Sequence, residues 1–194
     1  MIRIYPLAFI LLWSSAFITT KPIVDNSDPF SALAFRFFFV AVGFYLFSIY
    51  SKNSIIVKRR NLIESTFSGV LFHGFYLGGV FFSISIGMPA GIAALIVTLQ
   101  PILTNLLSGP ILKERITIKQ WVGALFGFVG AALVLGLDLG SEIPTKGLIA
   151  TVIALIAITT STIWQKKLSN NLPLSVSNFY QAIGGCLFHV LLVV

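Results

Sequence analysis

The residues of this chain that could do chemistry are few, and most of them lie inside long apolar runs. Arg36 is the sharpest case, because it stands about seven residues, or roughly 10 Å of helix, inside such a run. A cation in lipid is costly, so Arg36 should face a protein interior or a water-filled cavity. There it could bind an anionic group such as a substrate carboxylate. Equally, it could extend to the interface and hydrogen-bond loop carbonyls.

His73 and Tyr76 stand three residues apart, a spacing that places both on one face of a helix. Histidine titrates near neutral pH, which suggests proton coupling, whereas a hydrogen-bonded packing role is the alternative. Trp13, Trp164 and Tyr180 could form the aromatic wall of a pocket. For Trp164, near the end of a run, an interfacial position competes with that interpretation.

Gln100 and Pro101 interrupt another apolar run near its middle. Proline removes one backbone hydrogen bond and frees the carbonyl of Val97, so we expect a kink there. Asn105 adds a further polar group that must face protein or water if the run crosses a membrane. The kinked helix could line a substrate pathway, or the kink could be purely structural.

Enzyme signatures are lacking in the sequence. There is no metal-spaced cluster of His, Cys or carboxylate residues and no glycine-rich phosphate loop. Cys186 is the lone cysteine, and Glu64 and Asp138 lie at the ends of runs. We therefore expect no catalytic residue, no metal and no cofactor.

The elements that carry these residues must be membrane helices. The chain is 57% apolar and only 10% charged, with a mean hydropathy of +0.97. A soluble domain is about half apolar and a quarter charged, so this chain lacks the charge to cover a water-facing surface. Its formal net charge of +7 comes from cations in short gaps between apolar runs, which suggests membrane topology and not nucleic-acid binding. Membrane lipids are the expected surroundings.

Seven apolar runs are long enough, or nearly so, to cross a hydrocarbon core as helices. They cover residues 4–22, 29–50, 65–87, 91–111, 119–138, 147–165 and 176–194. Short connections predict antiparallel helical hairpins, and unpaired strands are excluded because lipid cannot satisfy their backbone. The fold class is thus an all-α polytopic membrane protein.

The cations predict the orientation of these helices. When alternate connections are pooled, one side carries ten lysines and arginines: Arg3, Lys52, Lys58, Arg59, Arg60, Lys113, Arg115, Lys119, Lys166 and Lys167. The other side carries only Lys21 and Lys146. Since cytoplasmic loops are enriched in lysine and arginine, the N-terminus is expected in the cytoplasm.

Glycine spacing predicts close helix packing at two places. Gly123, Gly127 and Gly130 fall on one face of the fifth run, and Gly74 and Gly78 have the same spacing of four in the third. A sliding surface for conformational change is the alternative interpretation. We also consider a homodimer.

Several stretches resemble EamA-type members of the drug/metabolite transporter superfamily. They are Trp13–Phe17 with Lys21-Pro22, Pro29 with Ala34–Phe37, Ala93–Leu95 through Gln100-Pro101, Lys113–Arg115, and Gln120–Gly123 with Gly130. Their order and spacing cover the whole chain. The resemblance implies ten membrane helices in two inverted five-helix repeats.

On that basis, residues 1–140 would form the first repeat and residues 147–194 the first two helices of an incomplete second repeat. Residues 29–37 can be set against 173–181, with Tyr180 at the position of Arg36. We therefore expect a C-terminally truncated chain, with seven helices of ten.

The resemblance implies a secondary transporter in the bacterial inner membrane. It would export small organic metabolites such as amino acids by alternating access. Two alternatives are a membrane-embedded enzyme acting on lipid-linked substrates and a non-transporting membrane scaffold. Arg36 and the other polar and aromatic residues named above are the candidates for the substrate pathway: Trp13, His73, Tyr76, Gln100, Asn105 and Tyr180.

Overall fold

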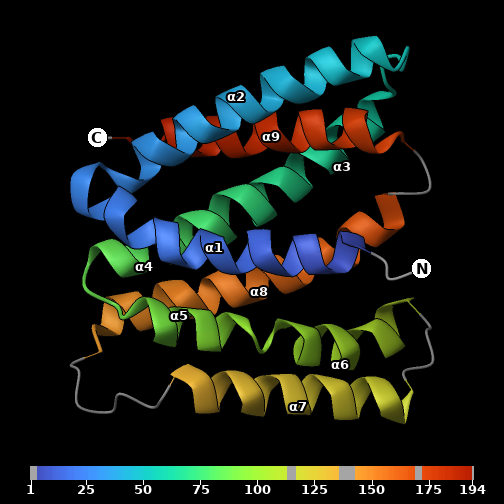
Figure 1. Cartoon of the computed structure of the whole chain (residues 1–194). Coiled ribbons are helices and arrows are strands. Elements are labelled where there is room, and N and C mark those ends of the chain that lie inside the picture. The colour runs from blue at the N-terminus through green and yellow to red at the C-terminus, as the bar shows by residue number, and fades with distance from the viewer. Residues whose placement is uncertain (1–3, 113–116, 136–142, 169–171, 194) are drawn as a thin grey trace.

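The computed structural model describes residues 4–112, 117–135, 143–168 and 172–193. Within those ranges every regular element is a helix, which agrees with the predicted all-α class (Figure 1). The elements are α1 Ile4–Asn26, α2 Pro29–Tyr50, α3 Arg59–Gly69, the π-helix η1 Val70–Leu77, α4 Gly78–Ser85, α5 Ala90–Val97, α6 Gln100–Leu112, α7 Ile118–Leu135, α8 Thr145–Leu168 and α9 Leu174–Val190.

Local sequence explains where several helices begin and end. Asp28 caps α2, because its carboxylate accepts a hydrogen bond from the amide of Ser31 at 2.6 Å, and Pro29 occupies the first helical position. Gly87 has φ of 96°, a conformation that glycine adopts readily, and it turns the chain between α4 and α5. Thr98 and Leu99 separate α5 from α6, and Pro101 is the second residue of α6.

Four segments of the described residues are long and apolar enough to cross a membrane: Pro29–Tyr50, Arg59–Ser85, Ala90–Ile111 and Thr145–Lys166. The second of these comprises α3, η1 and α4. Helices α1, α7 and α9 coincide with the other expected runs and are not among these four segments. The count of seven spans, and the ten expected from the resemblance, therefore stay predictions.

The helices lie side by side, and the segment formed by α3, η1 and α4 packs against both α9 and α8 (Figure 1). Helix α9 packs against α2 and also against α3 and η1. Helix α8 packs on η1 and α4. Helix α7 lies at the edge, against α5 and α6. This arrangement places η1 in the interior, between α8 and α9.

Candidate functional site

The π-helical turn η1 lies in the middle of a membrane-crossing segment and carries both His73 and Tyr76. Single π-helical turns within α-helices occur frequently at functional sites. The wider turn separates residues three apart by a larger angle than an α-helix does. His73 and Tyr76 both contact the ring of Phe72, but their other ring neighbours differ.

Tyr76 belongs to a group of three aromatic side chains that joins η1 to α1. The ring of Trp13 stacks on Tyr76 with centroids 6.4 Å apart, and it meets Phe72 edge-on at 6.5 Å. Phe72 and Tyr76 are themselves 5.4 Å apart. We call these three residues the aromatic cluster. Two of the candidates expected from the sequence, Trp13 and Tyr76, are thus in direct contact.

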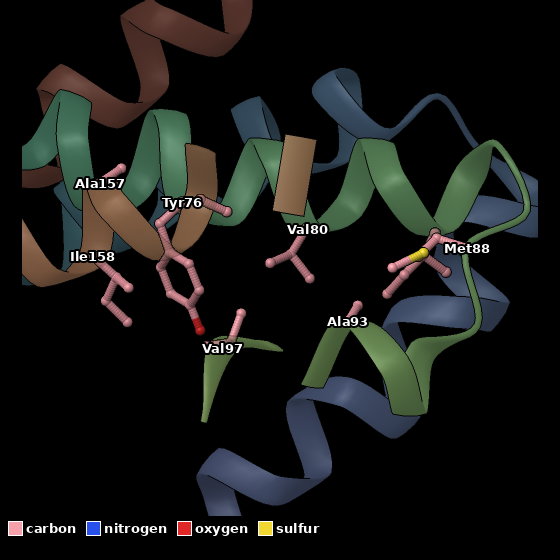
Figure 2. Close-up of a cluster of buried hydrophobic side chains, with 9 residues drawn as sticks. Tyr76, Val80, Met88, Ala93, Val97, Ala157 and Ile158 are labelled. Atoms are coloured by element: carbon pink, nitrogen blue, oxygen red, sulfur yellow. The ribbon is translucent and has the colours of Figure 1, made fainter. Parts of the chain in front are cut away.

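Tyr76 also reaches the hydrophobic core and is only 3% exposed. Figure 2 shows its ring extending from η1 toward Val97 of α5, with Val80 and Ala93 nearby and Ile158 of α8 on the other side. The aromatic cluster therefore connects α1, η1, α5 and α8. A movement of any one of these helices would change the contacts of Tyr76.

His73 faces α9, where it meets the other histidine of the chain, His189. The Nε2 of His189 lies 2.9 Å from the backbone carbonyl oxygen of His73. Since a carbonyl only accepts, His189 donates through Nε2. Phe37 of α2 lies beside both rings, with its centroid 4.3 Å from His73 and 5.9 Å from His189. We call His73 and His189 the histidine pair.

Two glycines allow the histidine pair to pack so closely. A Cβ atom on Gly78 would lie 2.9 Å from Cε1 of His189, and one on Gly185 would overlap with the Cβ of His73. Each histidine thus covers a glycine of the opposite helix. Gly74 is packed in the same way, since a Cβ there would lie 2.8 Å from the ring of Phe188. Gly74 and Gly78 therefore mark a close helix contact.

The Nδ1 atoms of both histidines are buried and have no hydrogen-bond partner among the described residues. A buried polar atom without a partner is uncommon in folded proteins and calls for an explanation. His189 as a whole is 0% exposed.

Arg36 lies on α2 next to Phe37, with its guanidinium carbon 5.8 Å from the centre of that ring. The residue is exposed, whereas Phe37 is buried. Arg36 is therefore separated from the histidine pair by one aromatic ring. The position suits an interaction with a group outside the described helices.

Tyr180 and Trp164 lie away from Trp13. The hydroxyl of Tyr180 donates to the carbonyl of Ile55 at 2.7 Å and so fastens α9 to the segment between α2 and α3. Trp164 packs edge-on against Phe67 at 5.8 Å. The three aromatic residues make separate contacts, and the common pocket wall considered from the sequence is not formed by the described residues.

Gln100 opens α6 and reaches α8. Its side-chain amide donates to Thr104 at 3.0 Å and to Thr162 at 3.3 Å. Asn105 is half-buried one turn further along. Gln100 thus joins α6 to α8, and no described hydrogen bond or ring contact links either candidate to the aromatic cluster.

A buried polar network links α3, α8 and α9, and the sequence reasoning missed it. Ser68 and Ser161 are 3.1 Å apart, and Gln165 donates to Ser161 at 3.2 Å and to Gln181 at 3.1 Å. Gln181 in turn donates to Ser177 at 3.0 Å. Gln165 and Gln181 within apolar runs were the sequence signal for this network. His189, also within an apolar run, was the signal for the histidine pair.

The glycines of α7 do not pack as expected. No heavy atom of the described residues lies within 4 Å of a Cβ built on Gly123, Gly127 or Gly130. Their spacing resembles that of Gly74 and Gly78, but α7 meets α5 and α6 through other residues. Lys113, Glu114 and Arg115, which also supported the resemblance, lie outside the described residues.

Two cavities lie away from these clusters. One, of about 610 Å³, is lined by Ser54, Ile56, Val57, Lys58, Arg60, Asn61, Leu172 and Pro173. The other, of about 270 Å³, is an apolar groove between α2 and α9, lined by Phe38, Ala41, Val42, Tyr45, Phe179, Ile183, Cys186 and Leu187. Neither is lined by a residue of the aromatic cluster or the histidine pair.

Comparison with known proteins decides the family. The model of the EamA-like transporter family matches residues 3–136. The chain belongs to the EamA-like transporter family. It is therefore an integral membrane protein, as its apolar helices indicate.

Individual relatives of this EamA-like chain are distant. A "Probable amino-acid metabolite efflux pump" of Salmonella typhimurium is 24% identical over 86% of this chain and 54% of its own length. The "Uncharacterized transporter YyaM" of Bacillus subtilis is 27% identical over 94% of this chain and 62% of its own. "Protein PecM" of Dickeya dadantii is 30% identical over 80% of this chain and 50% of its own. The chain thus spans roughly half to three-fifths of the length of these relatives.

Proposed function

We propose that this chain belongs to a secondary transporter that exports small organic metabolites, such as amino acids, by alternating access. The observation that carries the proposal is the family match over residues 3–136. Relatives from Salmonella typhimurium and Escherichia coli, both named as probable amino-acid metabolite efflux pumps, support the substrate class. The aromatic cluster supplies aromatic side chains in the interior of the helix bundle, where they could line a path for the transported molecule.

The proposal includes the placement of the chain. The N-terminus lies in the cytoplasm, and the protein resides in the bacterial inner membrane. Residues 1–140 form one five-helix repeat, and residues 147–194 contribute the first helices of a second, inverted one. The asymmetry of lysine and arginine between alternate connections supports this orientation.

Arg36 is the proposed contact for the carboxylate of the transported molecule. It is exposed on α2, beside a buried aromatic ring and close to the histidine pair. A guanidinium at such a position can bind a carboxylate through two parallel hydrogen bonds.

Efflux from cells tests the proposal. Cells that express the full-length protein and are preloaded with radiolabelled amino acids should lose label faster than cells with an empty vector. The Arg36→Ala variant should lose most of this difference, whereas the conservative Arg36→Lys should keep part of it. Equal efflux from expressing and empty cells for every amino acid would contradict the proposed function. Unchanged efflux in Arg36→Ala would remove Arg36 from the substrate path.

A further inference from the structure

The histidine pair holds two basic ring nitrogens, one in each neutral ring. His189 donates through Nε2 to the carbonyl of His73. In the neutral ring its Nδ1 then carries a free lone pair and no hydrogen. This Nδ1 and that of His73 are both buried and without a partner among the described residues.

Close contacts surround the pair. Gly78 and Gly185 let the helices approach until each histidine covers a glycine. Phe37 covers the side toward α2, with its ring 4.3 Å from that of His73. Neither described cavity is lined by His73 or His189. A proton is the one ligand that needs no volume at these nitrogens.

We propose that His73 and His189 form a proton-binding site that couples transport to a proton gradient, a proposal that rests on the proposed function. In the neutral state the hydrogen bond and the glycine contacts hold α9 on η1. A proton from water binds the unprotonated nitrogen of either ring, which in His189 is Nδ1, and makes that ring an imidazolium; the proton returns to water when the ring becomes neutral again. The step involves no other bond and no redox change.

Protonation would place a positive charge on a buried histidine ring, and this charge would couple proton binding to the conformation of the helices. An imidazolium among apolar side chains lacks the hydration that it has in water, so the charged pair favours a conformation in which the rings reach water. A ligand that binds one of two conformations better shifts the equilibrium toward it. Protonation therefore favours separation of α9 from η1, and release of the proton favours their contact.

Other charged and titratable groups near the pair are few. Arg36 of α2 acts on His73 electrostatically, Tyr76 follows it on η1, and Cys186 precedes His189 on α9. The sequence of α4 has no such group, and α8 has none between Lys146 and Lys166. The carboxylates Asp25 and Asp28 lie at the ends of α1 and α2, and Glu64 of α3 is paired with Arg60. Among the groups of this region, imidazole is the one whose ordinary pKa in water lies near neutral, so the histidines would take up a proton in a conformation that brings their rings to water.

A direct measurement of proton binding uses the ring nitrogens. We would record ¹⁵N spectra of the full-length protein, labelled at histidine, in lipid nanodiscs, and assign signals with His73→Asn and His189→Gln. At the alkaline end, His189 should be the tautomer with hydrogen on Nε2. Nδ1 of at least one of the pair should become protonated between about pH 8 and pH 5. Two rings that stay neutral over this range would overturn the proposal.

A flux measurement tests the coupling. In proteoliposomes with the full-length protein, coupling is measured as the ratio of radiolabelled amino-acid accumulation with a pH gradient to that at equal pH, each after subtraction of the value for empty liposomes. This ratio should exceed one for the wild type and fall to one for the double variant His73→Asn/His189→Gln, whatever exchange the variant keeps at equal pH. Ser65→Ala is the matched control, because this buried hydroxyl also lacks a described partner but does not titrate.

The outcomes separate the two proposals. Gradient-driven accumulation by the double variant equal to that of the wild type would overturn the proton site and leave the transporter standing. Histidine protonation in the spectra with no amino-acid flux in the wild type would support the proton site and contradict the proposed substrate class.

Discussion

The Nε2 of His189 donates to the backbone carbonyl of His73 across 2.9 Å, although the two residues are 116 positions apart in the chain. This bond joins α9 to the π-helical turn of another helix. It fixes the tautomer of His189 and directs the free nitrogen of its ring into the protein. The helix contact around this bond depends on two glycines, Gly78 and Gly185.

Replacement of either glycine under the histidine pair should destabilise the protein. A methyl group on Gly78 would lie 2.9 Å from the ring of His189, and one on Gly185 would overlap with the Cβ of His73. Overpacking of this kind costs about 1–3 kcal/mol. Thermal unfolding in detergent of Gly78→Ala and Gly185→Ala measures it.

The control is Gly123→Ala, where the added Cβ meets no described atom within 4 Å. Alanine in a helix is favoured over glycine by roughly 0.5–1 kcal/mol, so this variant should be at least as stable as the wild type. Equal unfolding temperatures for Gly78→Ala and Gly123→Ala would show that α9 does not approach η1 as described.

The hydroxyls of Ser68 and Ser161 should be energetically coupled. They lie 3.1 Å apart, both residues are 0% exposed, and Ser161 also lies 3.1 Å from the carbonyl of Ser68. Hydrogen bonds between membrane helices contribute about 0.6 kcal/mol on average. A double-mutant cycle with Ser68→Ala and Ser161→Ala should give a coupling energy of this size. Strictly additive effects would mean that α3 and α8 do not meet here.

Tyr180→Phe should loosen the segment between α2 and α3. The variant loses the 2.7 Å bond to the carbonyl of Ile55 while keeping the ring. Lys58 and Arg60 follow directly, and both are exposed. Trypsin added to inside-out vesicles should therefore cleave the variant several times faster at these residues. Tyr50→Phe, at a position that is 84% exposed, serves as the control and should cleave at the wild-type rate.

Single cysteines would reveal the orientation. Two variants, Ser27→Cys and Ser54→Cys, would each be made in a Cys186→Ser background. Residue 27 lies between α1 and α2, and residue 54 lies between α2 and α3. Both positions are exposed, so accessibility differs only by membrane side. A membrane-impermeant maleimide added to intact cells should label residue 27 and spare residue 54. The reverse pattern would place the N-terminus outside.

The sequence predicted the long apolar helices because hydropathy and helix length are local properties. It also placed Arg36 in α2 and located the interruption before Pro101. The spacing of Gly74 and Gly78 indicated close packing, and α9 does pack there. Gly123 and Gly127 have the same spacing, but no described helix packs closely on them. The spacing of glycines predicts a smooth helix face and does not specify which helix packs on that face.

The rest depends on contacts between distant segments. The π-helical turn changes which way His73 and Tyr76 face, and no local pattern marks it. His189 looked like one more residue of an apolar run until α9 was placed against η1. Gln165 and Gln181 likewise acquire meaning only when α8 and α9 are brought together with α3.

The proposed function requires the protein to move amino-acid-like metabolites along gradients without nucleotide hydrolysis. Counterflow measures this most directly: proteoliposomes with the full-length protein, loaded with an unlabelled amino acid and no ATP, are diluted into a trace of the radiolabelled form. For at least one of the twenty standard amino acids, we expect transient, saturable accumulation of label above that in empty liposomes. A flux indistinguishable from empty liposomes for every amino acid would contradict it.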